Sequence, residues 1–259
     1  MKKTKRHKKE RSRRGIYILP NIFTSLNLFC GFYAVIAAID GKFAAAAIAI
    51  IIGVMFDILD GKIARANNTT SQFGLEYDSL ADLVSFGLAP GIMIYLWALK
   101  PLGRIGWLAA FLFMACGALR LARFNSQVGT VGSDYFVGLP IPAGASMAAT
   151  TVLFCHRFNI AGNPIIILIL LYILSFLMVS TIKYYSFKKP ELFNKTKFDA
   201  LVILVLILVF IAAQPSIALF ILGVSYIISG PLAMTPHYKR YKLNKIEALK
   251  LEKRGSTSI

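Results

Sequence analysis

Long apolar segments recur along the whole chain, and they constrain its fold more than any other feature of the sequence. A transmembrane helix needs about 20 consecutive, mostly apolar residues to cross the hydrocarbon core. Eight segments approach or reach this length, at residues 19–39, 43–65, 75–99, 105–125, 140–156, 163–182, 199–213 and 215–234. With 57% hydrophobic and only 16% charged residues, the chain is too apolar for a soluble domain. The sequence therefore predicts an all-α, polytopic integral membrane protein.

Basic residues are unevenly distributed around these segments. If the N-terminus is cytoplasmic, 25 of the 29 lysines and arginines fall on the cytoplasmic side, as the positive-inside rule requires. We therefore expect a transmembrane domain at 16–236 between two basic cytoplasmic tails, 1–15 and 237–259. The net charge of +17 is then explained by topology and by contact of the tails with anionic membrane lipids. No nucleic-acid partner is expected.

Carboxylates are scarce in the chain, yet five of the twelve lie together in residues 56–87. Asp57 and Asp60 are three residues apart near the end of the second apolar segment, so they share one helical face. Asp78 and Asp82 are four residues apart and share a face near the start of the third segment. A short polar turn joins these two helices, so the helices must pack side by side. The two carboxylate faces can therefore meet.

Four carboxylates close to lipid would repel one another, and each is costly to desolvate. A divalent cation removes both costs, and an all-oxygen ligand set favours Mg²⁺ or Mn²⁺, with enough acids for two ions. Gly61, Ala64 and Gly74 fit a groove in which a ligand presses against the helix backbone, and Arg65 adds a cation suited to phosphate. The alternatives are structural, because a buried Asp can be an interhelical clasp and a Gly/Ala stripe can be a packing face.

Residues 57–82 also carry a complete sequence motif. The stretch "DILDGKIARANNTTSQFGLEYDSLAD" fits the pattern D-x2-D-G-x2-A-R-x8-G-x3-D-x3-D at every fixed position. This pattern resembles the signature of the CDP-alcohol phosphotransferases, which are integral membrane enzymes of phospholipid synthesis. The resemblance implies a core of six transmembrane helices, here followed by about two more, and a homodimer whose metal site opens to the cytoplasm. We expect the protein in a prokaryotic-type cell (inner) membrane, with both termini cytoplasmic.

The resemblance also implies roles for the matching residues. Divalent metals that grip the diphosphate of a CDP-linked lipid would be held by Asp57, Asp60 and Asp78, with Asp82 as a further candidate ligand. Gly61 and Ala64 would make room for the cytidine, and Arg65 would contact phosphate. Asp82 would be the general base.

A polar stripe on the first predicted helix points to the same groove. Asn21, Thr24 and Asn27 recur at helical spacing in "LPNIFTSLNLFCGF", and polar side chains facing lipid would be expensive. We expect these residues, together with Gly74, to line the binding site of the CDP-linked lipid. A hydrogen-bond ladder between packed helices is the alternative.

Three stretches resemble the serine-transferring branch of the family. They are the polar stripe, "ALRLARFN" with Arg120 and Arg123, and "DYFVGLPIPAGA", whose prolines and glycines indicate a stiff entry into the next helix. The glycerol-phosphate branch typically has Arg where this chain has Asn27. The resemblance therefore implies transfer of the phosphatidyl group of CDP-diacylglycerol to the hydroxyl of L-serine, giving phosphatidylserine and CMP.

Serine is a zwitterion, so its site needs a cation for the carboxylate and an acidic or polar group for the ammonium. Arg120 or Arg123 can supply the cation, although an arginine pair at this level can also extend to the membrane surface. Asn125 and Glu76 are candidates for polar contacts. Two other hypotheses stay open: another acceptor (glycerol phosphate, inositol phosphate or choline), and a cation transporter, which more often places its carboxylates at the membrane midplane.

Overall fold

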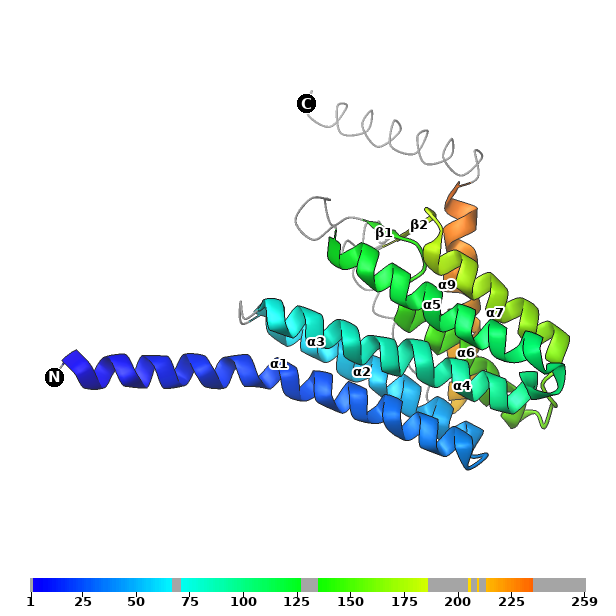
Figure 1. Ribbon diagram of the computed structural model, residues 1–259, viewed down its shortest axis with the longest axis horizontal. Coiled ribbons are helices and arrows are strands. Elements are labelled where there is room, and N and C mark those ends of the chain that lie inside the picture. The colour runs from blue at the N-terminus through cyan, green and yellow to red at the C-terminus, as the bar shows by residue number, and fades with distance from the viewer. Residues whose placement is uncertain are drawn as a thin grey trace, which may run out of the picture.

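A computed structural model describes residues 2–66, 71–126, 135–185, 205, 209 and 213–234, with the backbone alone for residues 2–19, 135, 136, 183, 185, 233 and 234. Over these residues the protein is a bundle of helices (Figure 1). The helices are α1 (Lys2–Ile39), α2 (Phe43–Ala66), α3 (Gln72–Asp82), η1 (Leu83–Leu88), α4 (Ala89–Ile94), η2 (Tyr95–Leu99), η3 (Lys100–Leu102), α5 (Arg104–Ser126), α6 (Ile141–Arg157), α7 (Pro164–Val179) and α9 (Pro215–Met234). The strands are β1 (Tyr135–Val137) and β2 (Lys183–Tyr185).

Five helical stretches in the described part of the chain are long and apolar enough to cross a membrane. They are Pro20–Ile39, Phe43–Ala66, Gln72–Leu102, Arg104–Ser126 and Pro215–Leu232. The segments expected at 140–156 and 163–182 correspond to the shorter helices α6 and α7. Most of the expected segment 199–213 and the tail 237–259 lie outside the described residues. The all-α, polytopic membrane class is confirmed, while the total number of spans stays a prediction.

Helices α1 and α2 form a hairpin whose interface is built from small residues. Ala34, Ala37, Ala46 and Ala47 are all buried there, which lets the two backbones approach closely, as is usual between membrane helices. Large apolar side chains such as that of Phe29, 64% exposed, lie on outward faces instead. This inside-out distribution fits a bundle surrounded by lipid.

The third membrane-spanning stretch, Gln72–Leu102, is one continuous helical rod, called the third rod below. It begins earlier than the sequence predicted. Ser71 caps α3, because its side chain accepts a hydrogen bond from the backbone N–H of Gly74 at 3.0 Å. The rod therefore starts at Gln72, whereas the sequence predicted a span from residue 75. Two π-helical turns, η1 and η2, interrupt it, and η1 begins directly after Asp82. Such turns widen the helix locally and often occur near functional sites.

A two-stranded antiparallel ribbon, which the sequence analysis did not predict, joins distant parts of the chain. β1 pairs with β2 in a register that sets Phe136 opposite Tyr184. The glycine that follows β1, Gly138, has φ +80°, and its backbone N–H donates to the carbonyl of Ile182 at 2.8 Å. In Figure 1 the ribbon lies beside the ends of α5 and α7, at the end of the bundle from which α1 projects.

Candidate active site

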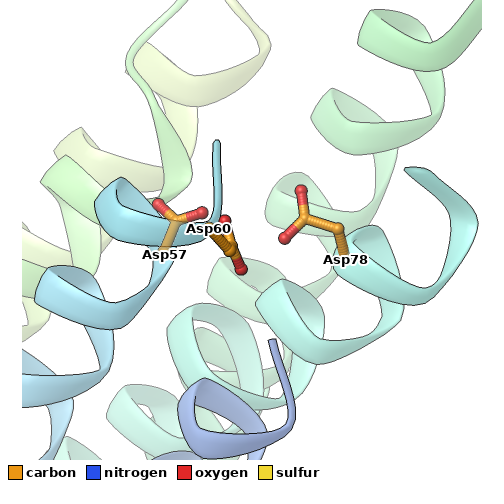
Figure 2. A group of neighbouring side chains, drawn as sticks. All are labelled: Asp57, Asp60 and Asp78. Carbon is orange, nitrogen blue, oxygen red and sulfur yellow. The ribbon is translucent and has the colours of Figure 1, made fainter. Parts of the chain in front are cut away.

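Three aspartates from two helices face one another at this end of the bundle. Asp57 and Asp60 come from α2 and Asp78 from α3, and one carboxylate oxygen of each lies within 4.8 Å of those of the other two. Figure 2 shows Asp78 reaching across from α3 toward the α2 pair. The sequence prediction that these carboxylates meet is therefore confirmed.

The donor set of this aspartate cluster fits a hard divalent cation. All its ligand atoms are carboxylate oxygens, which is the set that Mg²⁺ and Mn²⁺ prefer. Asp60 is only 5% exposed, and Asp78 Oδ1 is buried without a hydrogen-bond partner among the described residues. Carboxylates this close together would repel one another, and a shared divalent cation would offset that repulsion.

Helix α1 supplies hydrogen bonds to the acidic residues. Thr24, which is buried, donates from Oγ1 to Asp60 Oδ2 at 2.9 Å, and the same hydroxyl lies 3.2 Å from the carbonyl oxygen of Pro20. The side chain of Asn27 donates from Nδ2 to Asp82 Oδ1 at 3.0 Å. The predicted polar stripe thus faces the carboxylates, and two of its members contact them directly.

Asp82 lies beside the aspartate cluster and is not part of it. Its carboxylate is 7% exposed, and the group of oxygens within 4.8 Å of one another does not include it. Asp82 follows Asp78 by one turn of α3, deeper in the membrane span. Its candidate role as a metal ligand stays a prediction.

Glycine makes the close approach of the helices possible at Gly74. A Cβ atom built there would lie 3.1 Å from Ser71 Oγ and 3.6 Å from Asn21 Oδ1. Gly74 therefore leaves space for the cap of α3 and for the α1 side chain of Asn21. Both residues border the site, as the sequence predicts, although no described contact shows what they bind.

The Arg65 side chain folds back along α2 toward the site. A Cβ atom on Gly61 would meet Nη1 and Nη2 of Arg65 at 3.4 and 3.5 Å, so the guanidinium lies over this glycine. Arg65 also interacts electrostatically with Asp57 and Asp60. A guanidinium above a glycine of the helix backbone suits an incoming phosphate group. The contact of Ala64, which is half-buried, with a ligand stays a prediction.

The two arginines of α5 have different surroundings. Arg120 is 8% exposed, its Nε has no hydrogen-bond partner among the described residues, and it interacts electrostatically with Asp82. Arg123 instead donates from Nη1 to the carbonyl oxygen of Val179, the last residue of α7, at 3.4 Å. The structure therefore brings Arg120 to the site and engages Arg123 at a helix end.

The two remaining serine-site candidates also separate. Asn125 is half-buried and donates from Nδ2 to Ser79 Oγ at 2.9 Å, while its Oδ1 is buried without a partner in the described structure. Asn125 therefore contacts α3 at the residue that follows Asp78. Glu76 is exposed and accepts a hydrogen bond from Gln72 at 2.9 Å on the surface of α3. The structure thus packs Asn125 against α3 and leaves Glu76 exposed.

Buried polar atoms without a partner gather around this one site. Among the described residues they are Asn27 Oδ1, Asp78 Oδ1, Arg120 Nε and Asn125 Oδ1. Buried polar groups are rarely left without hydrogen bonds. Asp78 Oδ1, Arg120 Nε and Asn125 Oδ1 are therefore candidates for contact with a polar ligand, whereas Asn27 Oδ1 packs against Gly53 of α2.

Sequence reasoning missed three residues that the structure connects to the site. They are Ser79, Ser85, which donates to the carbonyl of Asn27 at 2.9 Å, and Tyr226 of α9, which interacts electrostatically with Arg120. A serine in the apolar run "LVSFGL" was a usable signal for Ser85. Nothing in the sequence connects Tyr226 to a residue more than 100 positions earlier.

Comparison with known proteins gives consistent matches. Residues 17–182 match the family model described as CDP-alcohol phosphatidyltransferase. Over 207 residues, 79% of this chain and 86% of the relative, the chain is 38% identical to the CDP-diacylglycerol–serine O-phosphatidyltransferase of Helicobacter pylori. The protein of the same name from Bacillus subtilis is 39% identical over 66% of this chain and 92% of its own length. The archaetidylserine synthase of Methanothermobacter thermautotrophicus is 38% identical over 64% of this chain and 69% of its own length.

Proposed function

Because the chain belongs to the CDP-alcohol phosphatidyltransferase family, we propose that it is a CDP-diacylglycerol–serine O-phosphatidyltransferase. It transfers the phosphatidyl group of CDP-diacylglycerol to the hydroxyl of L-serine and releases CMP. The observation that carries the choice of serine is the 38–39% identity, over most of the chain, to relatives named for this reaction. The buried cation Arg120 beside Asp82 supports the same choice.

Asp57, Asp60 and Asp78 would hold the divalent metal, Mg²⁺ or Mn²⁺, and Asp82, one turn further along α3, would be a further ligand if two ions bind. When bound, such ions neutralise the diphosphate of the lipid substrate and stabilise the charge on the departing CMP. Thr24 holds Asp60 in a fixed orientation through its hydroxyl. The support for this assignment is the all-oxygen cluster itself.

Asp82 acts as the general base in this proposal. It takes the proton of the serine hydroxyl, the serine oxygen attacks the phosphorus that carries the diacylglycerol group, and the bond from that phosphorus to CMP breaks. Asn27 occupies one carboxylate oxygen of Asp82, which leaves the second oxygen for the serine proton. Positioning and electrostatics then supply most of the rate, as in other phosphoryl transfers.

The CDP group would lie along α2 against Gly61 and Ala64, with Arg65 on phosphate. The Arg65 guanidinium already lies over Gly61, so it has to move by only a side-chain rotation to admit the nucleotide. Asn21, Gly74 and the Thr24 methyl group would line the opposite wall. The lack of a Cβ at Gly61 and Gly74 supports this placement.

Arg120 is the better candidate of the two arginines for the serine carboxylate. It is buried and interacts electrostatically with Asp82, whereas Arg123 donates to the Val179 carbonyl. A serine carboxylate held by Arg120 would bring the serine hydroxyl toward Asp82. The unpartnered Oδ1 of Asn125 suits the serine ammonium, and Glu76, which is exposed, receives no such support.

The site opens to the cytoplasm in this proposal, and both basic tails lie on the same side in contact with anionic lipid. Lys62, Arg65 and Arg123 lie at the end of the bundle that holds the aspartates, and all three belong to the basic majority assigned to the cytoplasm. Location in the cell (inner) membrane and assembly as a homodimer complete the proposal, with residues 16–236 as the catalytic domain.

An acceptor panel tests the choice of serine. Purified protein in detergent receives CDP-diacylglycerol and Mg²⁺, and CMP release is measured with serine, glycerol phosphate, inositol phosphate or choline. Release that depends on serine supports the proposal. Release that depends on another acceptor keeps the family and replaces serine. Silence with all four, together with metal uptake by proteoliposomes, would establish the cation-transporter alternative.

A further inference from the structure

Ser85 lies outside the sequence motif, but it is tied to the same α1 residue that contacts Asp82. Its side chain is 0% exposed, and its hydroxyl donates to the backbone carbonyl oxygen of Asn27 at 2.9 Å. The side chain of Asn27 in turn donates to Asp82 Oδ1 at 3.0 Å. Asn27 therefore accepts a hydrogen bond from Ser85 of the third rod and donates another to Asp82, which lies three residues before Ser85.

Direct contact of the two helix backbones accompanies this pair of bonds. Gly31 follows Asn27 by one turn of α1, and a Cβ atom built there would lie 2.6 Å from the Cα atom of Ser85. Real Cβ atoms do not approach this closely, so any larger residue at this position would push α1 away from η1. The glycine brings the Ser85 hydroxyl within reach of the carbonyl.

The Asn27 amide packs against α2 on its other side. A Cβ atom on Gly53 of α2 would lie 3.1 Å from Asn27 Oδ1, and Asn27 is 0% exposed. The glycine therefore leaves the space that the amide occupies, and a shift of α1 along the third rod would carry the amide away from Asp82.

We propose that Ser85 is a positioning residue for Asp82 and acts through Asn27. Its bond to the Asn27 carbonyl sets the register of α1 against the third rod, so that the Asn27 amide stays on one carboxylate oxygen of Asp82 and the other faces the acceptor hydroxyl. Ser85 itself contacts no substrate. The inference rests on the proposed role of Asp82 as general base.

Ser85→Ala removes the bond without adding bulk, and Ser175→Ala is the matched control. Ser175 is also a buried serine, but its hydroxyl donates only to a carbonyl of its own helix, that of Leu171 at 2.7 Å. We expect Ser85→Ala to lower kcat about 10- to 100-fold, because small misplacements of a catalytic group have effects of this size. The Kd for CDP-diacylglycerol in the presence of Mg²⁺ should stay unchanged, and Ser175→Ala should leave both quantities at wild-type values.

A double-substitution cycle separates positioning from a loss of packing. Asn27→Ala should lower kcat by itself, because the amide contacts Asp82. In the Asn27→Ala background, Ser85→Ala should lower kcat no further, since Ser85 has no amide left to position. Independent, multiplicative losses in the cycle would overturn the proposal.

Asn27→Ala by itself tests the proposal if Ser85→Ala does not fold. Wild-type kcat in Asn27→Ala alone would refute the proposal, because Ser85 can act on Asp82 only through this amide. Failure of the proposed function looks different, because the wild-type protein would then release no CMP in response to serine.

Discussion

The hydrogen bond from Thr24 to Asp60 gives a quantitative prediction about metal affinity. Thr24→Val keeps the size and shape of the side chain and removes the donor that lies 2.9 Å from Asp60 Oδ2. Asp60 is 5% exposed, so water has little access to replace the lost bond. Its carboxylate then has to be held in a metal-binding orientation without a partner on Oδ2, and the metal should bind more weakly.

The size of this loss follows from other metal sites. Loss of an outer-shell hydrogen-bond partner typically weakens metal binding by about 10- to 100-fold. The metal dissociation constant of Thr24→Val should therefore rise roughly 10- to 100-fold.

The assay is titration of the purified protein with Mn²⁺, followed by electron paramagnetic resonance, together with the Mg²⁺ concentration that gives half-maximal CMP release. Thr151→Val is the matched control, because Thr151 is buried and its hydroxyl donates only to the carbonyl of Met147 in its own helix at 2.7 Å. Wild-type metal affinity in Thr24→Val, or an equal loss in Thr151→Val, would refute the reasoning.

Three further predictions concern the substrates. Asp82→Asn should abolish turnover while leaving CDP-diacylglycerol binding largely intact, as measured by equilibrium binding in Mg²⁺; a comparable loss of binding would place Asp82 among the metal ligands. Arg120→Gln should raise the KM for serine about 10- to 100-fold, the value of a charged hydrogen bond, whereas Arg123→Gln should change it little; equal effects in steady-state assays would contradict the distinction. Gly61→Ala should raise the KM for CDP-diacylglycerol without lowering the thermal unfolding temperature, because the added Cβ meets only the movable end of Arg65. A folded Gly61→Ala with wild-type KM would exclude cytidine from this part of α2.

The aspartate cluster could be predicted from sequence because it depends on local geometry. Spacings of three and four residues fix which carboxylates share a face, and a short turn forces the two helices together. The start of the third rod could also have been predicted from the sequence. Ser71 followed by an acidic and apolar run is an N-cap signal, and giving it weight would have set the boundary at Gln72.

Other features depend on contacts between distant segments. Arg120 and Arg123 cannot be told apart from the sequence. Packing of α5 against its neighbours decides which of the two is buried. The β1–β2 ribbon joins residues 135–137 to 183–185, and neither strand is long enough to give an alternating pattern. The π-helical turns leave the apolar pattern of the third rod intact, so no sequence signal marked the π-helical backbone around Ser85.

The most direct test of the account is incorporation of radiolabelled serine into phosphatidylserine by the purified protein with CDP-diacylglycerol. The same sample is measured with Mg²⁺, after removal of metal with EDTA, and after Mg²⁺ is restored. We expect labelled phosphatidylserine and CMP to form in equal amounts. Formation of both products should stop with EDTA and resume when Mg²⁺ is restored. Incorporation that persists without metal, or CMP release that leaves serine unlabelled in lipid, would contradict it.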